Sequence, residues 1–231
     1  MNNIKHFSFD LWLTLIKSNM TFKKERSKYF FKNFNSLSKS IEEVEFIFRN
    51  IDLKCNSINE ITGKNIDAEE MYLMVIFYLN GTIKPFENID LTSLYIEIEK
   101  LFFEYSPILF NNETQNCLDK IKQNTSNTLN ILSNTGFIKG KTLKKVLDNL
   151  EISQYFNFEI YSDEIGFSKP NLKIYNNMIF EVLRLRNQTI SLNEIIHIGD
   201  NYNADILGAR NAGIKAFQIN SNNYSIIDII K

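Results

Sequence analysis

The chain has 231 residues, of which 44% are hydrophobic, and its formal net charge is −1. This length suits one large domain or a core with an insert, and the charge disfavours nucleic-acid binding and a polybasic membrane-surface protein. The content of only 8 glycines and 3 prolines favours long helices over a turn-rich β-sandwich. The two cysteines, Cys55 and Cys117, form neither a CxxC pair nor a zinc spacing, so we expect inert, reduced thiols in a cytoplasmic protein.

The N-terminal half begins as a strand and then becomes helical. Residues 4–10 are mostly apolar and predict a strand that ends on Asp10. From residue 20 to 106, apolar side chains recur at helical spacing in about four segments, and no strand pattern is clear. The most apolar run, residues 71–79, is too short to cross a bilayer and predicts a buried helix.

After Pro107, short apolar strands alternate with amphipathic helices, which is typical of βαβ units. The predicted order is a helix at 113–123, a strand ending at Ser133, a helix at 139–149, a helix behind Pro170, a strand ending near Asp200, a loop and helix, and a last strand at 215–219. We therefore predict an α/β fold. A Rossmann-like parallel sheet core (1–17 and 107–231) carries an inserted all-α helical cap domain (18–106).

Chemically useful side chains follow the predicted strands. Asp10 ends the first, Ser133 and Asn134 end the second, and Asp200 follows "IIHIG", with Asp205 shortly after it. Ligands of an open parallel sheet bind beyond the carboxyl ends of its strands. Carboxylates there suit Mg²⁺, while a hydroxyl and a lysine such as Lys169 suit phosphate oxygens.

Four segments, "FSFDLWLTL", "ILSNTG", "GFSKPNLKIY" and "IGDNYNAD", resemble the four motifs of the haloacid dehalogenase superfamily, in the same order. The interval between the first two motifs has room for the helical cap that this family often inserts there. The resemblance covers essentially the whole chain. It implies a hydrolase with an α/β core and a cap.

The resemblance also implies roles for individual residues. Asp10 is implied as nucleophile and Mg²⁺ ligand, and Thr14 as a structural residue with a hydrogen bond to the catalytic loop. Further metal ligands are implied to be the main-chain carbonyl of Trp12, Asp200 and Asp205. The phosphoryl group is implied to be bound by Ser133, Asn134 and Lys169, and Lys169 is also implied to balance the charge of Asp10.

Trp12 departs from the phosphatase pattern of that family, which has an aspartate at this position. Its indole nitrogen only donates a hydrogen bond, so it cannot replace the general acid and base. Losing such a group costs ~10²–10⁴ in rate, and least where the leaving group is a stable anion. The family's 2-haloacid dehalogenases carry an aromatic residue at this position, but they use no metal, and the two acidic residues of their last motif are not both kept. This sequence keeps both acids, as Asp200 and Asp205.

The sequence thus favours a Mg²⁺-dependent phosphatase of a small phosphorylated metabolite, with reduced or selective activity. The alternatives are a 2-haloacid dehalogenase-like hydrolase and a catalytically impaired protein that binds a phosphometabolite.

Several residues keep a structural interpretation beside the functional one. Asp205 could cap a helix, Lys169 could be a solvated lysine, and Trp12 could be either packing or a pocket wall. His197 lies in an apolar strand and is expected to be a core histidine, and His6 receives no role. The basic run from Lys23 to Lys32 either steers an anionic substrate or, as such runs usually do, forms a solvated helix face.

Overall fold

Five parallel strands form the centre of the molecule in the order β5-β4-β1-β6-β7. The computed structural model describes residues 3–82 and 88–230. The sheet strands are β1 (His6–Phe9), β4 (Thr128–Ser133), β5 (Phe158–Tyr161), β6 (Ile195–Gly199) and β7 (Lys215–Gln218). The predicted α/β fold with a parallel sheet is confirmed.

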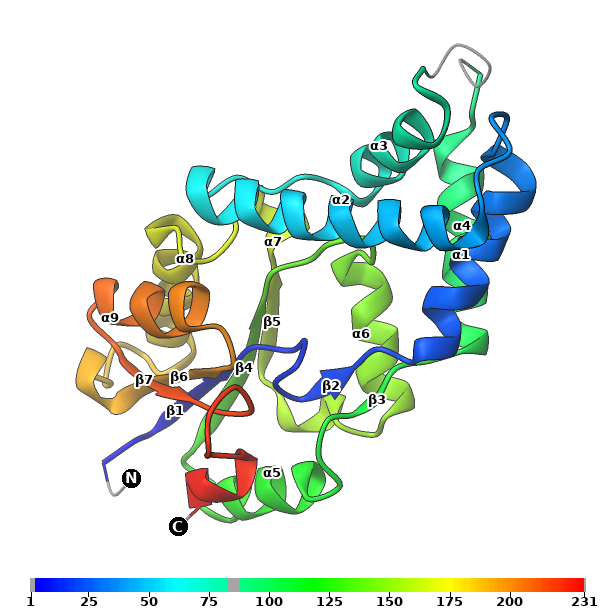
Figure 1. Cartoon of the computed structure of the whole chain (residues 1–231). Coiled ribbons are helices and arrows are strands. Elements are labelled where there is room, and N and C mark those ends of the chain that lie inside the picture. The colour runs from blue at the N-terminus through cyan, green and yellow to red at the C-terminus, as the bar shows by residue number, and fades with distance from the viewer. Residues whose placement is uncertain (1–2, 83–87, 231) are drawn as a thin grey trace.

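Helices cover both faces of this sheet, as Figure 1 shows. On one face lie α5 (Thr114–Gln123) and α6 (Gly140–Asn149), which begin one residue later than the sequence predicts. On the other lie α8 (Leu172–Leu185) and α9 (Gly208–Asn211). The short elements are α7 (Ser162–Ile165), a π-helix η4 (Tyr202–Leu207), and 3₁₀ helices η2 (Ser153–Tyr155), η3 (Leu192–Glu194) and η5 (Ile226–Ile230).

A two-stranded antiparallel ribbon lies where the chain leaves the sheet and returns to it. Its strands are β2 (Ile16–Lys17) and β3 (Ile108–Leu109), with Ile16 opposite Leu109. The sequence did not predict this ribbon, because two residues are too few to show the alternation of a strand.

In the sequence, four helices lie between the two strands of the ribbon. They are α1 (Met20–Phe34), α2 (Ile41–Thr62), α3 (Ala68–Asn80) and α4 (Leu91–Glu104). A capping box between Ser40 and Glu43 starts α2, and Gly63 ends it with a positive φ of 67°. The domain limits 1–17, 18–106 and 107–231 remain predictions, and residues 1–2, 83–87 and 231 lie outside the described residues.

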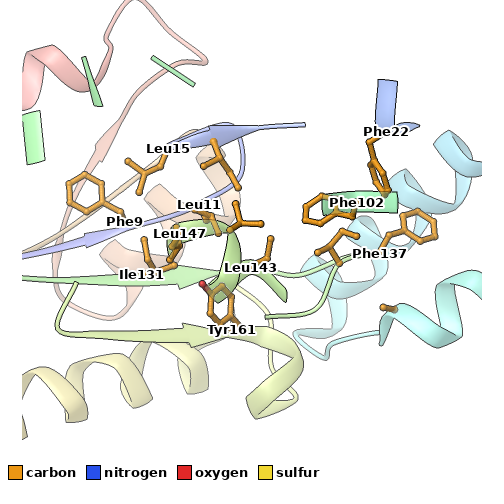
Figure 2. Close-up of a cluster of buried hydrophobic side chains, with 14 of the residues drawn as sticks. Phe9, Leu11, Leu15, Phe22, Phe102, Ile131, Phe137, Leu143, Leu147 and Tyr161 are labelled. Atoms are coloured by element: carbon orange, nitrogen blue, oxygen red, sulfur yellow. The ribbon is translucent and has the colours of Figure 1, made fainter. Parts of the chain in front are cut away.

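The apolar core continues from the sheet into the helical insert. Figure 2 shows Phe9 and Ile131 of the sheet in the same cluster as Phe22 of α1 and Phe102 of α4. The predicted buried helix at 71–79 is confirmed within α3, where Met71 and other apolar side chains are fully buried. Burying each such side chain stabilises the fold by ~1.5–3 kcal/mol. Of the helices in the described residues, none is long and apolar enough to cross a bilayer.

Candidate active site

The candidate site lies at the carboxyl edge of the sheet, where β1, β4 and β6 end side by side. β1 pairs with β4 on one side and with β6 on the other, so Phe9 stands opposite both Ile131 and Ile198. Asp10 therefore emerges between the ends of these neighbours. Because parallel strands share one carboxyl edge, distant motifs meet there.

Lys169 reaches this edge from the loop before α8. Its Nζ lies 2.7 Å from Oδ1 of Asp10 and 2.6 Å from Oδ1 of Asp205. The lysine is only 1% exposed, so its interpretation as a solvated surface lysine is wrong. A buried ammonium between two carboxylates is held by charge, since burial alone would disfavour it.

Asn134 holds the backbone of Lys169 in place. Its Oδ1 accepts a hydrogen bond from the Lys169 amide at 2.7 Å, and its Nδ2 donates to the Lys169 carbonyl at 3.0 Å. Ser133 is fully buried, and its Oγ donates to the carbonyl of Asn134 at 3.1 Å. The sequence suggested only substrate contacts for this pair and missed that Asn134 positions Lys169.

Thr14 orients the other oxygen of Asp10. Its Oγ1 donates to Oδ2 of Asp10 at 3.0 Å, so the expected hydrogen bond to the catalytic loop is present. With Lys169 on Oδ1, both carboxylate oxygens of Asp10 have donors. The side chain is therefore fixed in one orientation at the end of β1.

Three groups lie within hydrogen-bond distance of the Asp205 carboxylate. Oδ2 accepts from the backbone amide of Asn201 at 2.9 Å, and Oδ1 lies 3.2 Å from Nε2 of His197 as well as next to Lys169. A Cβ on Gly199 would stand 2.2 Å from Oδ2, so only glycine leaves room for this carboxylate. Asp205 lies within the π-helix η4, an element frequently found at functional sites.

His197 confirms its expected place in the core and adds a contact that the sequence did not reveal. It is fully buried, and its Nδ1 lies 2.9 Å from Oγ of Ser8. Its other ring nitrogen faces Asp205. The helical spacing and strand pattern gave no signal for this contact, because the histidine and the aspartate belong to different elements.

Asp10, Asp200 and Asp205 form a group of potential metal ligands. One carboxylate oxygen from each lies within 4.8 Å of the others. Three carboxylates against one lysine leave a formal charge of −2, which one divalent cation balances. An all-oxygen donor set is the kind that Mg²⁺ prefers, so these residues fit the ion that the sequence implies.

Crowding of the acids shifts their pKa values. Burial, together with the charges of Asp10 and Asp205, raises the pKa of Asp200 to about 7. Burial also raises the pKa of Asp10, outweighing the opposite effect of Lys169. At Asp205, burial is outweighed by Lys169 and His197, so its pKa lies below the usual range. A cation beside Asp200 would favour its ionised form.

Trp12 is half-buried just beyond Asp10 and faces the helical insert. Its ring lies 6.5 Å from that of Phe102 in an edge-to-face arrangement. Trp12 therefore packs against a residue of α4, which agrees with its interpretation as a packing residue. Because an indole cannot act as a general acid, position 12 offers no side chain that could protonate a leaving group.

The end of α2 and the turn after it touch the loops of the site. Oε1 of Glu60 accepts from Nδ2 of Asn201 at 2.9 Å, next to Asp200. The carbonyl of Gly63 accepts from the amide of Ser168, beside Lys169, at 3.2 Å. In Figure 1, α2 extends across the sheet on the side where these loops lie. The end of α2 and the turn after it thus lie over the loops of the candidate site.

Comparison with protein families gives one match over most of the chain. The family model of haloacid dehalogenase-like hydrolases matches residues 4–213. A glyceraldehyde 3-phosphate phosphatase of Methanothermobacter thermautotrophicus is 35% identical over 105 residues, which are 42% of this chain and 44% of that protein. The chain therefore aligns with less than half of that relative's length.

Solved structures share the fold at low identity. The hydrolase YfnB of Bacillus subtilis, in a structure with bound magnesium, gives a TM-score of 0.65 at 19% identity, covering 94% of this chain and 87% of that one. L-2-haloacid dehalogenase of Xanthobacter autotrophicus gives 0.59 at 18% identity, covering 94% and 77%. A magnesium-bound hydrolase and a haloacid dehalogenase thus share this architecture, so the fold alone does not distinguish their activities.

Proposed function

The chain belongs to the haloacid dehalogenase-like hydrolases, and on that premise we propose that it is a Mg²⁺-dependent phosphohydrolase of a small phosphorylated metabolite. The observation that supports this most is the buried position of Lys169 between Asp10 and Asp205, with Asp200 close by. This arrangement offers a carboxylate nucleophile, a cation for phosphoryl oxygens and a set of metal ligands at one place.

The reaction proceeds in two steps through Asp10. One Oδ of Asp10 forms a bond to phosphorus, and the bond from phosphorus to the leaving oxygen breaks, with that oxygen taking the electron pair. Water then attacks the phosphoaspartate and regenerates the carboxylate, releasing inorganic phosphate. Thr14 keeps Asp10 oriented, and the Lys169 ammonium balances charge on the nucleophile and the phosphoryl group.

Mg²⁺ is proposed to be held by Asp10, Asp200 and Asp205 together with the main-chain carbonyl of Trp12. When bound, it supplies positive charge for the phosphoryl oxygens. Ser133 stands at the end of β4 as the proposed hydroxyl contact to the same oxygens. The amide of Asn134 contributes through its hydrogen bonds to Lys169.

Trp12 selects the leaving group. Without an acid at this position, an alkoxide must depart unprotonated, which is unfavourable. Acyl phosphates and aryl phosphates release more stable anions and lose less. We therefore expect turnover of acetyl phosphate and weak turnover of a sugar phosphate.

The test measures phosphate release from acetyl phosphate and from glucose 6-phosphate, each with Mg²⁺ and with EDTA. Asp10→Asn removes the nucleophile, and Asp119→Asn, an exposed aspartate on α5 that bonds Tyr155, is the matched control. We expect Mg²⁺-dependent release from acetyl phosphate in the wild type and in Asp119→Asn but not in Asp10→Asn. No release from either compound overturns the proposal.

The aromatic side chain at position 12 also supports a second candidate, a 2-haloacid dehalogenase, since halide leaves without a proton. In that reaction Asp10 displaces halide from carbon and forms an ester. The unscreened acids Asp200 and Asp205 would repel a haloacid carboxylate. Full activity on L-2-chloropropionate in the presence of EDTA would decide for this candidate.

A further inference from the structure

Arg26 is a buried cation of the helical insert, and the core of the site does not use it. It lies on α1 and is only 7% exposed. Its guanidinium carbon lies 4.1 Å from the ring centre of Phe48, 4.5 Å from that of Phe137 and 5.3 Å from that of Phe22. Three aromatic faces thus enclose the charge.

The guanidinium lacks an acidic partner. Within residues 3–82 and 88–230, no carboxylate oxygen lies within 4.0 Å of Arg26, and its buried Nε has no hydrogen-bond partner. Buried charges in proteins are normally paired, because removing an ion from water is costly. Aromatic rings offset part of this cost but accept no strong hydrogen bond from Nε.

The surroundings add positive charge to that of Arg26. Lys23 on the same helix and Arg49 on α2 interact electrostatically with one another, and Asp52 is the acid that acts on this group. Asp52 is itself 3.8 Å from Arg49. These four side chains together carry a formal charge of +2.

Arg26 lies next to the loop that carries the proposed phosphate contacts. Phe137, one of its three aromatic neighbours, lies three residues after Asn134 in that loop. Oδ1 of Asp52 lies 3.9 Å from the position of a Cβ on Gly136, so the charged group and this loop are in contact.

A chain of aromatic contacts links Arg26 to the other side of the site. Phe22 packs on Phe102 with ring centres 5.0 Å apart, and Phe102 packs on Trp12. Figure 2 shows Phe22, Phe102 and Phe137 grouped at the end of the buried cluster that faces the insert. Arg26 is therefore connected through ring contacts both to the loop after β4, by way of Phe137, and to Trp12, by way of Phe22 and Phe102.

We propose that Arg26 is a specificity-determining residue that binds a carboxylate on the substrate, at the end away from the phosphoryl group. This rests on the proposed phosphohydrolase function and narrows its substrate class to small phosphorylated carboxylic acids. A planar guanidinium matches a carboxylate with two parallel hydrogen bonds, which a lysine cannot reproduce. The Tyr72 hydroxyl already makes one hydrogen bond with Arg26. The carboxylate supplies what is missing, a full negative charge in contact with the guanidinium and an acceptor for its Nε.

The test uses non-hydrolysable ligands of increasing length with the Mg²⁺-loaded protein. Phosphonoacetate, 3-phosphonopropionate and 4-phosphonobutyrate are each compared with the alkylphosphonate of matching chain length by calorimetry. The measured quantity is the ratio of the two dissociation constants for each length. We expect the carboxylate to improve binding about tenfold or more at one length of the series.

Variants connect this ratio to Arg26. Arg26→Met keeps an apolar stem among the aromatic rings and is expected to bring the ratio to about one. Lys100→Met is the matched control, because Lys100 is an exposed cation of α4 that is paired with Glu97, and it should keep the wild-type ratio. Arg26→Lys keeps the charge without the planar fork and should give an intermediate ratio.

A ratio near one at every length in the wild type overturns the proposal, as does an unchanged ratio in folded Arg26→Met. If Arg26→Met does not fold, a wild-type ratio in Arg26→Lys overturns it. A purely structural Arg26 would change thermal stability but not this ratio. Turnover of acetyl phosphate without a carboxylate preference refutes only the role of Arg26, whereas a carboxylate preference without turnover refutes only the phosphohydrolase.

Discussion

The catalytic edge of the sheet and the aromatic face of the insert handle buried charge in opposite ways. At the edge, Lys169 lies between two carboxylates, and each carboxylate has further donors. In the insert, Arg26 lies among three rings without a carboxylate within 4.0 Å in the described part of the chain.

Under the proposals made above, the two regions have separate tasks. A network in which charges hold one another keeps its geometry without substrate, as a preorganised catalytic site requires. A cation that lacks its anion gains most when a ligand supplies one. Changes at the edge should therefore affect every substrate, whereas changes in the insert should affect the preference among substrates.

The largest expected effect is that of Asp10→Asn at the edge. Removing the nucleophile should lower phosphate release on the order of 10⁴-fold or more for every substrate. Steady-state rates with acetyl phosphate measure this loss. A loss that differs strongly between substrates would break the division of tasks between the two regions.

Lys169→Met should cost the next largest free energy, in stability as well as in activity. It leaves the carboxylates of Asp10 and Asp205 buried without their shared cation, which costs ~3–5 kcal/mol. Urea unfolding measures the change. Mg²⁺ should restore part of the stability, because it replaces the missing charge, and an equal loss with and without Mg²⁺ would contradict the proposed metal site.

His6, at the opposite end of β1, should make stability depend on pH without touching the chemistry. It is fully buried between Thr128 and Asn130, and burial lowers its pKa from 6.5 to about 4. Between these values the unfolded chain binds a proton that the folded chain does not, so stability falls as pH falls from about 6.5 to about 4. The full effect is ~3 kcal/mol.

Urea unfolding of the wild type and of His6→Gln across this pH range isolates the contribution of His6, since the carboxylates affect both proteins alike. The variant should show a weaker fall in stability towards low pH. Parallel curves for the two proteins would contradict the shift assigned to His6.

The smallest expected effect is a gain of function at Trp12, which belongs to both regions. Trp12→Asp places an acid two residues after the nucleophile and should raise turnover of glucose 6-phosphate ~10²-fold relative to acetyl phosphate. Trp12→Phe is the control, because it keeps a ring against Phe102 but adds no acid. Equal gains on both substrates would show that Trp12 limits access rather than proton transfer.

The sequence alone determined the class of fold and which residues lie at the carboxyl edge of the sheet. Helical spacing in the insert and alternation after Pro107 are local patterns, and a residue directly after a strand of a parallel sheet must lie at its carboxyl edge. Asp10, Ser133 and Asp200 could therefore be selected before any coordinates.

Only the tertiary structure decided which of these groups contact one another and with what charge balance. Three sets of contacts join separate elements, so no local pattern reports them. They are the ion pairs of Lys169 with Asp10 and Asp205, the hydrogen bond of Asn134 with the backbone of Lys169, and the contact of His197 with Asp205. The burial of Arg26 is the clearest case, since the solvated face expected for its basic run does not hold for it. Helical spacing describes one helix, but burial depends on the neighbours that pack against it.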